Sequence, residues 1–153
     1  MTAVRTSTIT TNGVQLVVHE AGEVGHPIVI LSHGFPELAH SWRHQMAPLA
    51  AAGYHVIAPD QRGYGHSTAP TAIDAYGTDN LTADLFGLLD HYGQDDAVFV
   101  GHDWGSMVVW EAARHRPERV RAVVGVSVPY VEWPAPPIQL MQMVYGDRFF
   151  YIL

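Results

Sequence analysis

Residues 98–106 read Val-Phe-Val-Gly-His-Asp-Trp-Gly-Ser, and this stretch decides the fold. An apolar strand over residues 97–100 leads into a Gly-x-Asp-x-Gly turn, and a helix over residues 106–115 follows. Glycine on both sides of Asp103 lets strand and helix approach closely around a strained turn. The sequence therefore predicts a strand-turn-helix elbow with Asp103 at its apex.

Strands and helices alternate on both sides of this elbow. Asn12-Gly13 separates two alternating segments, residues 5–10 and 14–20, which predicts a hairpin. Continuous branched apolar runs predict buried strands, and periodic segments between them predict helices. This alternation predicts a mostly parallel sheet with helices on both faces and the hairpin as an antiparallel edge. The expected buried strands are residues 27–32, 55–59, 97–100 and 120–128, and the expected helices are residues 41–52, 78–92 and 106–115.

Helix ends can be predicted from capping residues. We expect Ser41 to cap the first helix, Gly53 to stop it and Pro48 to end or kink it. Thr78 or Asp79 is expected to cap the second helix.

The composition shifts after Pro129, where a Pro-rich stretch precedes a helical segment over residues 138–145. We therefore expect residues 1–129 to form a core and residues 130–153 to begin a second, helical module. The chain ends in an apolar run, Phe149-Phe150-Tyr151-Ile152-Leu153. Because domain ends are usually polar, we interpret this end as an interruption.

The 153 residues carry a formal net charge of -7, and all eight basic residues are arginines without a cluster. Nucleic acid is therefore not an expected partner. The chain has no cysteine, which excludes disulfides and thiolate metal sites. No secretory signal and no apolar stretch of about 18 residues is visible, so we expect a cytoplasmic protein without a membrane partner. Asp95-Asp96 lacks a third ligand, and no metal ion is expected.

The elbow residue suggests a chemistry. A serine at this position attacks acyl carbon and needs a base, whereas a carboxylate is already an anion and can displace at saturated carbon. The helix N-terminus stabilises the charge of Asp103, and Trp104 supplies the next backbone N–H. The loop His33-Gly34-Phe35-Pro36 follows a strand and brings the Phe35 N–H beside the elbow. From the residues alone, two ordinary tight turns remain an alternative interpretation.

Three motifs occur in one order: His-Gly-Phe-Pro at residues 33–36, Asp-Gln-Arg-Gly-Tyr-Gly-His-Ser at residues 60–67, and Gly-His-Asp-Trp-Gly at residues 101–105. With them the chain resembles soluble, bacterial-type epoxide hydrolases of the α/β-hydrolase fold. The resemblance implies an α/β-hydrolase core followed by the start of a helical cap. It implies Asp103 as nucleophile, the backbone N–H groups of Phe35 and Trp104 as oxyanion hole, and a cis Phe35–Pro36 bond. Supporting motif residues are then His33, Gly34, Pro36, Gly101, His102 and Gly105.

The resemblance also implies two cap tyrosines that protonate the epoxide oxygen, and Tyr151 is the candidate for one of them. Packing among neighbouring aromatic side chains is the alternative role for Tyr151. The second tyrosine, the catalytic acid and the catalytic His of the family would lie beyond residue 153. We therefore expect these 153 residues alone to be insoluble or inactive, with one alkylation at most. His33 and His102 are expected to support their loops, and most other histidines to be solvated.

The expected substrates are a small apolar epoxide and water, with no cofactor, and a homodimer is compatible with the sequence. A haloalkane dehalogenase would use the same aspartate and also resembles this chain at Asp103-Trp104. Its halide is commonly held by an Asn side chain paired with a Trp, and this chain has Phe35 at the position of that Asn. A fluoroacetate-type dehalogenase carries Arg where this chain has Trp104. A serine esterase would have to use Ser106, which follows the turn apex. A binding piece or inactive fragment without the catalytic His is a further alternative.

Overall fold

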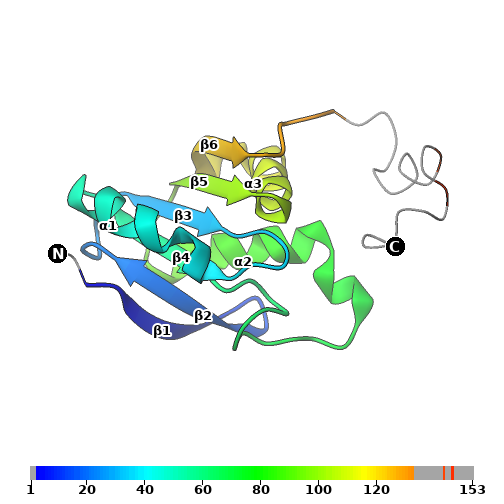
Figure 1. Ribbon diagram of the computed structural model, residues 1–153, viewed down its shortest axis with the longest axis horizontal. Coiled ribbons are helices and arrows are strands. Elements are labelled where there is room, and N and C mark those ends of the chain that lie inside the picture. Colours follow the sequence, from blue (N-terminus) through cyan, green and yellow to red (C-terminus); the bar gives the residue numbers. More distant parts are fainter. Residues whose placement is uncertain (1–2, 133–142, 144–145, 147–153) are drawn as a thin grey trace.

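A computed structural model describes residues 3–132 together with Met143 and Gly146. These residues form a six-stranded sheet with the order β1-β2-β4-β3-β5-β6 (Figure 1). β1 (Arg5–Thr11) and β2 (Val14–Ala21) pair as an antiparallel hairpin at one edge, and β2 pairs antiparallel with β4. The other neighbouring strands pair parallel. The expected mostly parallel sheet with a hairpin edge is confirmed.

The remaining elements follow the predicted alternation of strand and helix. The strands are β3 (Ile28–Ser32), β4 (His55–Pro59), β5 (Ala97–His102) and β6 (Val120–Val126), and the helices are α1 (Arg43–Ala51), α2 (Thr78–His91) and α3 (Trp104–His115). Short 3-10 turns cover Ala39–Trp42, Ile73–Tyr76 and Pro117–Arg119. Within the described part of the chain, no helix has both the length and the apolarity needed to cross a membrane.

The sheet is covered on both faces, with α1 on one side and α2 and α3 on the other (Figure 1). Alternate residues of each central strand point to opposite layers. Ile30 and Phe99 pack with Leu88 of α2, whereas Val29 and Leu31 pack on the α1 side. Because both faces are buried, these strands read as continuous apolar runs rather than alternating patterns.

The start of the first helix differs from the prediction. A 3-10 turn precedes α1, so Trp42 is the N-cap of the helix and the expectation that Ser41 caps it was wrong. Pro48 does not end the helix, which continues to Ala51. The backbone hydrogen bond that it removes would go to His44, an exposed residue. Gly53 does stop the helix, with a φ of 92°.

Other boundaries also differ from the prediction by one or two residues. Gly77 occupies the N-cap position of α2, in place of the expected Thr78 or Asp79. α3 begins at Trp104, two residues before the predicted start, because Asp103 alone makes the turn between β5 and the helix. β6 ends at Val126, since Ser127 adopts a φ of 66° and leaves the extended conformation.

A buried ion pair joins the loop after β4 to α2. The Arg62 Nε donates to an Asp84 carboxylate oxygen at 2.7 Å, and both residues are 3% exposed. The Arg62 guanidinium also donates to the Ala75 carbonyl, and Asn12 of the hairpin turn donates to Asp84 at 3.0 Å. One carboxylate therefore holds the hairpin turn, the 60–67 loop and α2 together.

A second buried network lies between the hairpin, β4 and the end of α2. The carboxylate of Glu20 accepts hydrogen bonds from Ser7 Oγ and His55 Nε2, each at 2.9 Å. Burial alone would raise the pKa of Glu20, but hydrogen bonds from Tyr92, His55 and Ser7, together with the charge of Arg5, hold it below its ordinary value. His55 is fully buried, and burial lowers the pKa of its imidazole. His55 is therefore an exception to the expectation that most of the other histidines are solvated.

β3 and α3 touch backbone to backbone at Gly105. A Cβ on this residue would lie 2.1 Å from the Ser32 carbonyl oxygen and 2.6 Å from that of His33. Any side chain here would push α3 away from the sheet. The second glycine of the elbow is therefore required by close approach.

We expect Asp84→Ala to lower the free energy of unfolding by about 3–5 kcal/mol, because it leaves the Arg62 guanidinium buried without its carboxylate. Urea denaturation of the protein expressed from its complete reading frame measures the change. The control is Asp96→Ala, which removes an exposed ion pair with Arg121 and should cost less than about 1 kcal/mol. Equal losses in the two variants would contradict the assigned role of the buried pair.

The free energy of unfolding should fall as the pH drops below about 6.5, the ordinary pKa of histidine. His33 and His55 have lowered pKa values in the folded protein, so the unfolded chain binds protons first. Their stabilising contribution is present above about pH 6.5 and is lost on acidification. His55→Gln retains an N–H for Glu20 and should reduce the pH dependence, whereas exposed His44→Gln should not. Denaturation at pH values from about 7.5 to about 5 measures this, and an unchanged dependence in His55→Gln would refute it.

Gly105→Ser should destabilise the fold by about 1–3 kcal/mol or more, because its Cβ meets two backbone carbonyls. The matched control is Gly77→Ser, where a Cβ meets nothing closer than 3.5 Å and serine suits the N-cap position. Thermal unfolding compares the two variants. Similar melting temperatures for both would show that α3 is not held by this contact.

Candidate active site

Three parallel strands end at the same edge of the sheet. The loops that follow them are residues 33–37 after β3, residues 60–67 after β4 and residues 101–105 around the end of β5. Ser32 pairs with Gly101, so the first and third loops lie side by side. β4 and β5 flank β3 on opposite sides, and ligands in such sheets bind at this kind of switch point.

Asp103 occupies the apex of the predicted elbow. Its φ of 53° and ψ of −124° lie outside the regions that residues other than glycine prefer. The strained backbone is held on both sides: the Asp103 N–H donates to the Val126 carbonyl at 3.2 Å, and the Asp103 carbonyl accepts from the Ser106 N–H at 2.9 Å. The side chain is half-buried at the N-terminus of α3, where the helix dipole favours a negative charge.

The loop after β3 lies directly against this carboxylate. The Phe35 N–H donates to Asp103 Oδ1 at 3.0 Å. The approach requires glycine at position 34, because a Cβ there would lie 2.4 Å from the Asp103 Cβ. The Phe35–Pro36 peptide bond is cis, as expected. Trp104 is the first residue of α3, so its N–H is not used by the helical ladder.

His33 connects two of the loops from a fully buried position. Its Nε2 accepts the Gln61 N–H at 3.0 Å, and its Nδ1 lies 2.9 Å from the Gly34 carbonyl oxygen. The ring of Tyr64 meets the imidazole edge to face at a centroid distance of 4.8 Å. Burial and the charge of Asp103 raise the pKa of Tyr64. Sequence reasoning missed Gln61 and Tyr64, although both lie in the 60–67 motif that it quoted.

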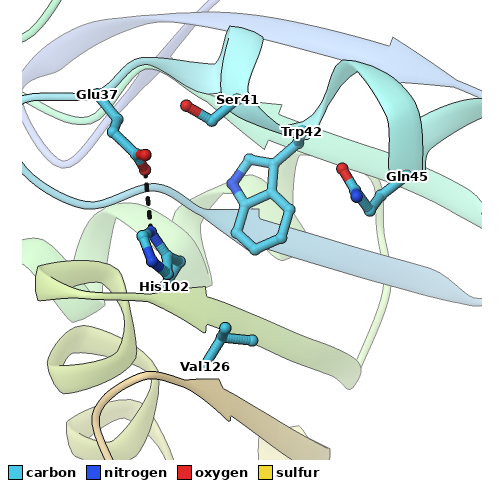
Figure 2. Close-up of a pocket in the computed structure, with 6 residues that line it drawn as sticks. All are labelled: Glu37, Ser41, Trp42, Gln45, His102 and Val126. Atoms are coloured by element: carbon cyan, nitrogen blue, oxygen red, sulfur yellow. Dashed lines mark hydrogen bonds and ion pairs between the residues drawn. The ribbon is translucent and has the colours of Figure 1, made fainter.

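His102 and Glu37 point toward one another across a small pocket (Figure 2). The His102 Nδ1 lies 3.0 Å from a Glu37 carboxylate oxygen, which ties the elbow to the loop after β3 a second time. Trp42 lines the same pocket of about 160 Å³. Its indole Nε1 is buried and has no hydrogen-bond partner among the described residues. Sequence reasoning missed Glu37, which directly follows Pro36.

Ser106 cannot act as the nucleophile of a serine esterase in this arrangement. The residue is fully buried, and its Oγ bonds to the carbonyls of Gly101 and Val126 at 2.8 and 2.9 Å. These hydrogen bonds hold the elbow against β6. As the sequence indicated, Ser106 does not lie at the apex of the turn.

The candidate Tyr151 lies outside the described residues, as does the helix expected over residues 138–145, apart from Met143. Within the described part of the chain, no group of three or more His, Asp or Glu side chains is arranged to hold a metal ion.

Comparisons with known proteins agree with the observed fold. Epoxide hydrolase A of Mycobacterium tuberculosis is 59% identical over 146 residues, which cover 95% of this chain and 45% of that protein. The crystal structure of Epoxide Hydrolase A from Mycobacterium thermoresistibile matches with a TM-score of 0.93 and 55% identity, over 98% of this chain and 48% of that one. An epoxide hydrolase from Vigna radiata matches with a TM-score of 0.89 and 40% identity, over 96% and 48%.

The chain spans about half the length of these relatives. A family model described as alpha/beta hydrolase fold matches residues 27–147. Because this match covers well over half of the sequence, the protein belongs to the alpha/beta hydrolase fold family.

Proposed function

We propose that this chain carries the nucleophile and oxyanion hole of an epoxide hydrolase. The observation that carries the proposal is the 3.0 Å hydrogen bond between the Phe35 N–H and Asp103 Oδ1 at the apex of the elbow. The contact holds a carboxylate at the end of the sheet, where a substrate can reach it, and places a backbone donor beside it. The names of the relatives support the same activity.

In the first step a carboxylate oxygen of Asp103 attacks an epoxide carbon, and the ring C–O bond breaks. An alkyl ester forms on Asp103, and the released alkoxide takes a proton from an acid, for which Tyr151 is the candidate. No base is needed here, because the carboxylate is already an anion.

In the second step water attacks the ester carbonyl carbon and gives one proton to a general base, a role that the resemblance assigns to a histidine of the family. The negative charge that develops on the carbonyl oxygen is held by the N–H groups of Phe35 and Trp104. Collapse of this intermediate breaks the bond between the carbonyl carbon and the alkoxy oxygen. The alkoxy oxygen takes a proton as the vicinal diol leaves, and Asp103 retains one oxygen atom from water.

We propose a small apolar epoxide as the substrate. Phe35, whose backbone N–H contacts the carboxylate, is 51% exposed, and Trp104, which follows Asp103 in the chain, is half-buried. Apolar side chains at this position favour an apolar group next to the epoxide ring. We also propose that residues 130–153 begin a cap over this site.

A haloalkane dehalogenase would use the same carboxylate and needs side-chain N–H donors for the leaving halide. The side chain at position 35 is a phenyl ring, and the backbone N–H of this residue is directed at Asp103. These observations favour the epoxide over the haloalkane.

The test is a single turnover of the protein, expressed from its complete reading frame, with styrene oxide in water enriched in the heavy oxygen isotope. We expect the isotope in the carboxylate of Asp103, because water attacks the ester and not the epoxide carbon. Peptide mass spectrometry locates it. Asp103→Ala should form no ester, whereas the control Asp95→Ala, an exposed carboxylate, should react normally.

Two outcomes would contradict this proposal. Isotope that enters only the diol would indicate direct attack by water on the epoxide. Halide release from a chloroalkane, without diol formation from styrene oxide, would indicate the dehalogenase.

A further inference from the structure

The peptide group between Gly34 and Phe35 is held at both ends. Its N–H donates to Asp103 Oδ1 at 3.0 Å. Its carbonyl oxygen accepts the Glu37 N–H at 3.0 Å and lies 2.9 Å from His33 Nδ1. A peptide group is planar, and its C=O and N–H point in opposite directions. Whatever fixes the carbonyl therefore also sets the direction of the N–H.

The hydrogen bonds of His33 determine its tautomer. The Gln61 N–H donates to Nε2, so Nε2 must be the unprotonated, accepting nitrogen. The proton of the neutral ring is then on Nδ1, where it points at the Gly34 carbonyl. Burial holds the pKa of His33 below its ordinary value, which favours the neutral ring, although the bond to Gly34 and the charges of Asp60 and Glu37 oppose this shift.

We propose that His33 is a positioning residue that aims the Phe35 N–H at Asp103 by holding the Gly34 carbonyl with its Nδ1–H. The inference rests on the proposed function, because it concerns the N–H assigned to the oxyanion hole. His33 therefore does more than support its loop. Its Nδ1–H affects the reaction by holding the Gly34 carbonyl, whereas its Nε2 orients the ring.

Two substitutions separate the two nitrogens. The side-chain amide of asparagine can replace Nδ1, so His33→Asn retains a donor for the Gly34 carbonyl and loses the bond from Gln61. The longer amide of glutamine can replace Nε2, so His33→Gln retains an acceptor for the Gln61 N–H and loses the bond to Gly34. Both variants place a neutral amide in the same buried site.

The rate of ester formation on Asp103 and the rate of ester hydrolysis are measured separately in single turnovers with styrene oxide. Loss of one oxyanion donor costs roughly a hundredfold to a thousandfold in rate. A misdirected donor should cost on the order of tenfold to a hundredfold, mainly in hydrolysis. We therefore expect ester to accumulate in His33→Gln, and hydrolysis in His33→Asn to be at least about tenfold faster than in His33→Gln.

Nuclear magnetic resonance provides readouts that need no substrate. In the unsubstituted protein the ring nitrogens of His33 should show the neutral tautomer with its proton on Nδ1. The Phe35 amide proton should move upfield in His33→Gln, because its hydrogen bond to the carboxylate weakens, and should move less in His33→Asn. If His33→Gln does not fold, the tautomer in the unsubstituted protein still tests the proposal.

A proton on Nε2, an unchanged Phe35 amide in His33→Gln, or equal hydrolysis rates in the two variants would overturn the proposal. The proposed function fails separately. If the unsubstituted protein forms no ester while the Phe35 amide responds as expected, the positioning role holds and the epoxide hydrolase assignment is wrong. If ester forms and His33→Gln hydrolyses it as fast as His33→Asn, the assignment stands and the positioning role is wrong.

Discussion

The site depends on one contact, the backbone approach between the loop after β3 and the start of α3. Gly34 lies against Asp103, and Gly105 lies against the carbonyls that end β3. Both approaches leave no space for a Cβ. Because the two segments touch through backbone, the position of the carboxylate relative to the Phe35 N–H is set by rigid peptide groups rather than by mobile side chains.

Polar groups then orient what the backbone contact brings together. His33 joins the loops after β3 and β4, and the pair of Glu37 with His102 joins the loops after β3 and β5. The Arg62–Asp84 pair holds the 60–67 loop on α2. Each of these groups bridges two segments, so the three loops form one hydrogen-bonded unit at the end of the sheet. Such a unit keeps a donor and an acceptor aligned without any rearrangement during reaction.

Much of this arrangement can be predicted from local patterns. The buried strands and the elbow follow from apolar runs and from glycines at fixed spacing, which act within a few residues. The helix starts cannot be predicted in this way. Ser41 and Thr78 are suitable N-cap residues, but a 3-10 turn precedes α1, and Gly77 takes the N-cap position of α2. Buried polar residues such as His55 are also missed. The partner of His55, Glu20, lies 35 residues away on a strand that becomes a neighbour only in the folded sheet.

The positive φ of Asp103 has an evolutionary consequence. Strain of this kind costs about 1–3 kcal/mol, and glycine in the same conformation largely avoids it. The chain is therefore less stable with aspartate at position 103 than it would be with glycine there. A library selected only for resistance to heat should drift away from aspartate at position 103, whereas a library selected for the proposed reaction, in which Asp103 is the nucleophile, should keep it. Stability and the proposed chemistry make opposite demands on this one residue.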